Sequence, residues 1–74
     1  MKTKSLSAVL HKEGDGYVSI CPELDIASQG DTLEEALSNL KEAVEGFFSV
    51  ADEEEVHRRL KSPVFVTQFE AQYA

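Results

Sequence analysis

The hydrophobic positions of the chain follow two different periods in succession. Apolar and polar residues alternate over residues 5–13 and again over 17–21, and this alternation is typical of β-strands. The sequence EGDG at residues 13–16 separates the two runs, and an Asp-Gly pair in such a place is a strong hairpin signal. Pro22 ends the second run, because proline lacks the N–H that a β-ladder needs. The pattern predicts a hairpin, followed by a short third strand at residues 26–29.

A long amphipathic helix is predicted after the turn at Gly30. Apolar residues recur there with i, i+3, i+4, i+7 spacing for more than four turns. They are Leu33, Ala36, Leu37, Leu40, Ala43, Val44, Phe47 and Phe48. Asp31 or Thr32 caps the helix, and an acidic residue three positions later completes a capping box. Gly46 lowers helix propensity by about 1 kcal/mol relative to alanine, so the helix weakens or ends near it.

The last third of the chain predicts a short helix and a strand. Residues 52–61 form a second short helix or an extension of the first, with acids first and bases last, as the helix dipole favours. Its expected i, i+4 ion pairs are Glu54–Arg58 and Glu55–Arg59. Ser62-Pro63 breaks this helix, and the alternation over residues 64–70 predicts a last strand.

These elements predict one α+β domain that spans residues 1–74, with the order β-β-β-α-β. A right-handed crossover would place the last strand parallel to the first and beside it. The mixed sheet would then run third, second, first, last, with the main helix on one face. Since one helix covers one face, the other face or an edge stays available to a partner.

Size and charge narrow the expected partners. A domain of 74 residues buries only about 60% of its unfolded surface, so we expect a homodimer or a higher even-numbered oligomer. Acidic residues outnumber basic ones by 14 to 7, for a net charge of -7. This charge repels phosphates and attracts basic proteins, so we expect no direct nucleic-acid binding. With no apolar run near 18 residues and one cysteine, we expect a cytoplasmic protein without a membrane span.

The residue types that carry catalysis or bind metals are sparse. His11 and His57 are far apart, and Cys21 stands at a strand end, where a small buried side chain is the ordinary role. A meander followed by a helix and a parallel strand is also how the ribonuclease H fold begins, but those enzymes need an acid in the middle of the first strand. The sequence SAVL at residues 7–10 has none, so we expect no enzyme, no metal and no cofactor.

Several short motifs follow one another along the chain: Gly16-Tyr17-Val18, Cys21-Pro22-Glu23-Leu24, Gln29-Gly30-Asp31-Thr32, Glu35-Ala36 and Asn39-Leu40-Lys41-Glu42-Ala43. Together they resemble the HicB family, the antitoxins of HicA ribonuclease toxins. The resemblance implies a partial ribonuclease H-like domain without catalytic acids, which covers the active surface of a small basic toxin that cleaves messenger RNA. Many members carry a C-terminal DNA-binding domain. This sequence stops at Ala74 without one, so we expect no autonomous promoter binding.

The leading hypothesis is therefore a non-catalytic antitoxin, or antitoxin-like module, of a type II toxin–antitoxin system. Its candidate binding residues are the acids that capping does not use: Glu23 and Asp25 in the loop, and Glu42 and Glu45 on the polar helix face. The alternative is an orphan HicB-like protein with a small-molecule or RNA-processing enzymatic role that uses the acidic loop.

Overall fold

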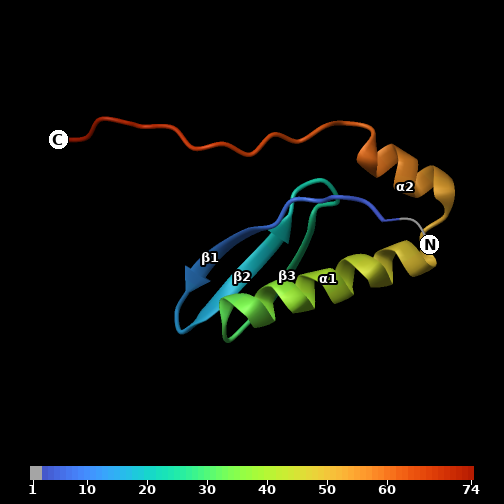
Figure 1. Cartoon of the computed structure of the whole chain (residues 1–74), viewed down its shortest axis with the longest axis horizontal. Coiled ribbons are helices and arrows are strands. Elements are labelled where there is room, and N and C mark those ends of the chain that lie inside the picture. Colours follow the sequence, from blue (N-terminus) through green and yellow to red (C-terminus); the bar gives the residue numbers. More distant parts are fainter. Residues whose placement is uncertain (1–2) are drawn as a thin grey trace.

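The computed structural model describes residues 3–74 and has two layers, a sheet and a helix that covers one of its faces (Figure 1). The elements in chain order are β1 (Val9–Glu13), β2 (Gly16–Cys21), β3 (Ile26–Gly30), α1 (Leu33–Val50) and α2 (Glu53–Leu60). The strands form an antiparallel sheet in the order β1-β2-β3. The predicted α+β class, the three-strand meander, the main helix and the short second helix are all confirmed.

The β1–β2 hairpin forms as predicted, although its turn is centred one residue earlier than the Asp-Gly pair. Glu13 lies opposite Gly16, so Gly14 and Asp15 make a two-residue connection. Gly14 has φ +59°, in the left-handed region that favours glycine. A positive φ at the first connecting residue is typical of a type II′ turn, whose twist matches that of the strands.

The face of β2 that looks polar in the sequence is the one that packs against α1. Ser19 and Cys21 are both buried beneath the helix. The Ser19 hydroxyl donates a hydrogen bond to the Ala36 carbonyl oxygen at 2.8 Å, which satisfies this buried polar group. Val18 and Ile20 consequently lie on the uncovered face, where they are half-buried.

The first turn of α1 approaches the end of β3 too closely for any side chain at Gly30. A Cβ atom there would lie 2.5 Å from the Ala36 nitrogen and 2.8 Å from the Glu35 carbonyl carbon, both of them backbone atoms. Thr32 caps the helix, and its side chain accepts a hydrogen bond from the Glu35 N–H at 3.0 Å. The prediction of a cap at this position is confirmed for Thr32, and the cap fixes where the helix begins.

The core lies between α1, β2 and the loop that follows β2. Its buried members are Cys21, Leu24, Leu40 and Val44, with Leu6, Ile26, Phe47, Phe48 and Leu60 packed around them. Leu40 is 3% exposed, which confirms the predicted phase of the helix. The helix continues through Gly46 to Val50, so Gly46 does not end it.

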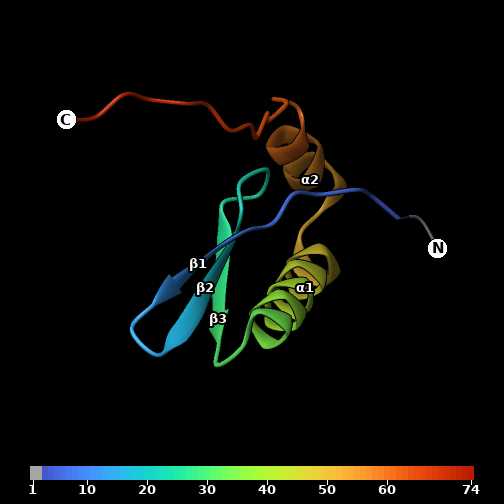
Figure 2. The same ribbon diagram turned by 60° about the vertical axis from the view of Figure 1, so that its left-hand side comes forward.

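The predicted fourth strand does not form within the chain. Residues 64–70 pair with no strand among the described residues, and the sheet has three strands. Residues 64–74, here called the C-terminal segment, are extended and exposed, and in both views they run outside the sheet and helix layers (Figures 1 and 2). The chain leaves α2 at Lys61 and passes through Ser62-Pro63 on this outer course, so no strand from residues 3–74 occupies the position beside β1.

Two glycine substitutions test the close approach of α1 to β3. Gly30→Ala should lower the free energy of unfolding by about 1–3 kcal/mol, because the methyl group meets backbone that cannot rotate away. Gly46→Ala is the matched control, since a Cβ there meets nothing within 4 Å. It should raise the free energy of unfolding by about 0.5–1 kcal/mol through helix propensity. Urea denaturation measures both, and equal effects of the two changes would contradict this packing.

Candidate interaction surfaces

The acidic loop after β2 is an ordered turn, held from inside by Leu24. The Leu24 N–H bonds the Cys21 carbonyl oxygen at 3.3 Å, and the Leu24 side chain is fully buried. Asp25 follows with φ +55°, a conformation that Asp and Asn adopt more readily than most residues. The loop therefore presents Asp25 to solvent in a fixed backbone conformation.

The Glu23 carboxylate accepts hydrogen bonds from groups of its own chain, so it is not a free acid available to a partner. Its two carboxylate oxygens accept hydrogen bonds from the Ser7 N–H at 3.1 and 3.0 Å. The Cys21 thiol donates to Glu23 Oε1 at 3.6 Å. Burial alone would raise the pKa of Glu23, but the hydrogen bonds from Ser7 and from its own backbone outweigh burial, so its pKa is lowered. Glu23 thus fastens the segment before β1 to the loop.

The other predicted binding residues, Asp25, Glu42 and Glu45, are exposed. Glu42 and Glu45 lie on the side of α1 opposite the buried stripe, and Glu45 makes an exposed ion pair with Lys41 at 4.0 Å. Such a pair contributes little to stability. The structure therefore does not gather the four acids into one surface, because the loop and the outer helix face are separate places.

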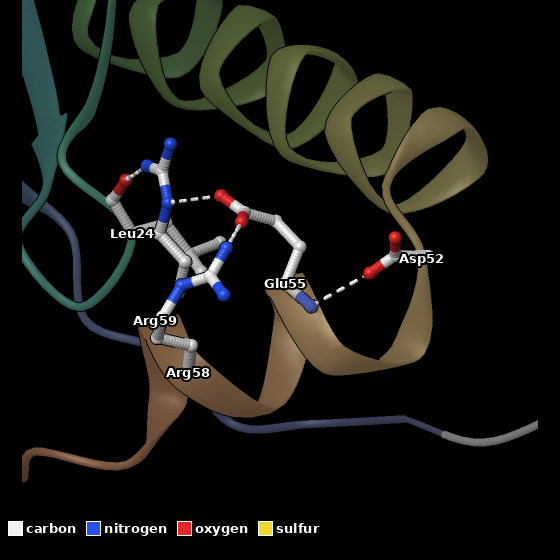
Figure 3. A network of polar contacts seen from close by, with 5 residues as sticks. All are labelled: Leu24, Asp52, Glu55, Arg58 and Arg59. Atoms are coloured by element: carbon white, nitrogen blue, oxygen red, sulfur yellow. Dashed lines mark hydrogen bonds and ion pairs between the residues drawn. The ribbon is translucent and has the colours of Figure 1, made fainter.

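A polar network ties α2 to the rest of the molecule (Figure 3). Arg59 donates to the Leu24 carbonyl oxygen at 2.7 Å and to the Glu55 carboxylate at 3.0 Å. Its guanidinium also lies 5.1 Å from the centre of the Phe47 ring. Arg59 therefore contacts the loop, α1 and α2 at once, and it fixes α2 against the body.

The acidic run at the start of α2 is partly used inside this network. Asp52 caps the helix by accepting from the Glu55 N–H at 2.8 Å, and Glu55 also pairs with Arg58. The predicted Glu55–Arg59 pair is confirmed, whereas Arg58 pairs with Glu55 rather than with Glu54. Asp52 and Glu55, two of the four acids at residues 52–55, are thus engaged within α2 as the cap and as an ion-pair partner.

Sequence reasoning missed the long-range bonds that side chains make to backbone. Asn39 donates its amide to the Gln29 carbonyl oxygen at 2.8 Å, and Arg59 bonds Leu24 across 35 positions. Asn39 belongs to a motif quoted for the HicB resemblance, and that was its only signal. For Arg59, nothing in the sequence pointed to the Leu24 bond; only the ion pair with Glu55 was predicted.

The described residues hold no group of three or more His, Cys, Asp or Glu side chains arranged to bind a metal. Burial raises the pKa of the Cys21 thiol, and the nearby Glu23 carboxylate raises it further. A thiol of this kind stays protonated and is a poor nucleophile. In the part of the chain that is described, neither helix has the length and apolar character needed to span a membrane.

The fold and these surfaces define a small acidic α+β protein with one helix layered on a three-stranded meander. A UPF0150 protein of Helicobacter pylori strain J99 is 33% identical over 70 residues, which cover 93% of this chain and 97% of the relative. The chain therefore belongs to the UPF0150 family. No family model and no solved structure matches it.

The lowered pKa of Glu23 predicts a pH-dependent contribution to stability. A carboxyl group with a depressed folded-state pKa stabilises the protein above its unfolded pKa, near 4.3, and this contribution is lost as pH falls through the folded value. Glu23→Gln should lower the free energy of unfolding by about 1 kcal/mol at neutral pH. The difference from the parent should vanish in acid.

Urea denaturation of the parent and the variant from pH 7 down to pH 2 measures this difference. Glu42→Gln is the control, because Glu42 is exposed and makes no internal bond in the described structure. A constant deficit for Glu23→Gln across this range would show that its charge contributes nothing.

Proposed function

We propose that the protein is a non-catalytic, HicB-type antitoxin module that binds and blocks a small, basic, mRNA-cleaving toxin of the HicA type. The observation that carries the proposal is the exposed acidic face of α1. Glu34, Glu35, Glu42 and Glu45 lie on this face, all exposed, among the polar positions that helical spacing sets opposite the core. Within the described residues, its one ion pair is the weak contact to Lys41.

An RNA-cleaving toxin needs a positive surface for phosphates, and carboxylates on a rigid helix are a suitable substitute for them. The helix is held at its start by the cap and by the contact with Gly30, so its acids keep a fixed spacing. Charge complementarity of this kind mainly raises the association rate and selects the partner. The net charge of -7 acts in the same direction at longer range.

The HicB resemblance supports the proposal at the level of the fold. Gly30, Thr32, Ala36 and Asn39 all belong to the quoted motifs. Thr32 caps α1, and the other three lie at the contacts between α1 and the sheet. A shared placement of the helix would give relatives the same outward face. The enzymatic alternative gains no comparable support, because the Glu23 carboxylate is engaged by Ser7 and Cys21.

The test is a charge reversal on α1, read as binding kinetics. Glu42→Lys with Glu45→Lys should slow association with a purified HicA-type toxin from the same organism, on the order of tenfold at low salt. The salt dependence of the rate should flatten, because rim charges steer encounters. Surface plasmon resonance at two salt concentrations measures both quantities.

The matched control is Glu13→Lys with Asp15→Lys at the hairpin tip, which changes the net charge equally. Its association rate should fall much less. Asp25→Asn probes the loop, since asparagine tolerates the positive φ there. Equal slowing by the helix and hairpin pairs would leave net charge alone as the cause and would refute an α1 binding face.

A further inference from the structure

The sheet has one edge that nothing in the described part of the chain covers. β1 and β3 are the edge strands. α1 packs mainly on β3, less on β2 and least on β1, and Asn39 bonds the Gln29 backbone at the β3 edge. Among residues 3–74, β1 has no such neighbour on its outer side. Unpaired edges of this kind readily accept another strand.

Hairpin geometry shows which β1 groups face outward. Glu13 and Gly16 close a two-residue hairpin and form a hydrogen-bonded pair, and opposed residues then alternate along the ladder. Leu10 and Lys12 therefore stand at the non-hydrogen-bonded positions. Their backbone N–H and C=O groups point to the free edge.

The placement of α1 over β3 also leaves an apolar flank of the helix uncovered. Leu33 and Leu37, one turn apart, are 47% and 49% exposed. By helical spacing they flank the buried stripe on the side opposite Asn39, which is the side toward β1. An added strand beside β1 would lie on the side toward which these two leucines project, next to the half-buried Leu10.

The C-terminal segment has the pattern of such a strand. Its odd-numbered residues are Phe65, Thr67, Phe69, Ala71 and Tyr73. In an extended chain they share one face, so three aromatic rings line one side. These rings are 87%, 86% and 96% exposed in order along the chain. A row of exposed aromatic rings forms a contiguous apolar patch, and such patches are typical of surfaces that contact another protein or a ligand.

We propose that the C-terminal segment of one copy adds as a fourth strand to the free edge of β1 in a second copy. Its aromatic face lies on the α1 side of the sheet, where the rings project toward Leu33 and Leu37, and the two copies exchange segments reciprocally. This contact is separate from the proposed antitoxin function, because it uses the sheet edge rather than the acidic face of α1.

Charge and position identify the occupant as a second copy. Residues 62–74 carry a single charged side chain, Glu70, so the segment joins an acidic body without strong repulsion and offers little attraction to a basic protein. In its own chain the segment runs outside the sheet in both views rather than along β1 (Figures 1 and 2). β1 of a second copy offers the same unpaired edge.

The exchange would bury enough surface for a stable dimer. An aromatic side chain buries about 150–250 Å², so three from each copy supply roughly 900–1,500 Å². Stable interfaces bury about 1,200–2,000 Å² in total, and the two strands add backbone hydrogen bonds.

Light scattering of the full chain tests the association at micromolar concentrations. We expect twice the 8.2 kDa mass of the chain. Phe65→Ser with Phe69→Ser should give the monomer mass, whereas Gln68→Ser with Gln72→Ser, on the opposite face of the same segment, should stay dimeric. A monomeric full chain, or equal effects of both pairs, would overturn the proposal.

A substitution in β1 tests whether its free edge accepts the added strand. Lys12→Pro removes an outward N–H, a change that an edge strand tolerates, and it should abolish the dimer. Lys12→Thr keeps the N–H and should stay dimeric. Circular dichroism checks that each variant keeps its fold. A dimer that survives Lys12→Pro in the folded state would rule out β1 as the acceptor.

Mixing the two defective variants tests exchange directly. The Lys12→Pro chain can donate its segment, and the Phe65→Ser, Phe69→Ser chain can accept one. At high concentration the mixture should therefore form a heterodimer with one of the two strand contacts, while each variant alone stays monomeric. Failure of the mixture to associate would overturn the strand exchange and favour pairing within one chain or contact through the sheet faces.

Discussion

The close approach of the first turn of α1 to the end of β3 is the constraint on which the rest of the structure depends. Gly30 has no room for a Cβ against the Ala36 backbone, and the Ser19 hydroxyl bonds the Ala36 carbonyl from the next strand. These contacts hold the helix over β2 and β3. Because the helix is held there, Leu40 and Val44 reach the core, while β1 remains at an uncovered edge.

Two distinct surfaces follow from this placement of the helix. The outward face of α1 carries acids on a rigid scaffold, suited to a basic partner. The flank toward β1 carries exposed leucines beside an open strand edge, suited to an apolar strand. They lie on different sides of the helix, so the two proposed contacts, one with a second copy and one with a basic protein, do not compete for the same surface.

Much of the fold follows from local patterns in the sequence. A cap at Asp31 or Thr32, the helical stripe with Leu40 and a hairpin turn within residues 13–16 depend on neighbouring residues, and the sequence was sufficient to predict them at that level. Alternation alone could not decide which face of β2 packs inward. Ser19 can be buried only because Ala36 supplies a hydrogen-bond acceptor, and that partner lies 17 positions away.

The candidate binding residues were harder to predict, for the same reason. Glu23 looked like a free acid until the fold brought the Ser7 N–H to its carboxylate. The alternation of residues 64–70 predicted an extended segment, which is observed, and a place in the chain's own sheet, which is not. A period of two indicates an extended strand but does not specify its neighbour.

The central claim is that the sheet of this protein is completed from outside the chain. Isotope-filtered nuclear Overhauser spectroscopy on an equal mixture of labelled and unlabelled chains tests it most directly. The account predicts contacts between different copies, from the ring protons of Phe65 and Phe69 to the methyl groups of Leu33 and Leu37. The same contacts seen only within one copy, or absent altogether, would contradict it.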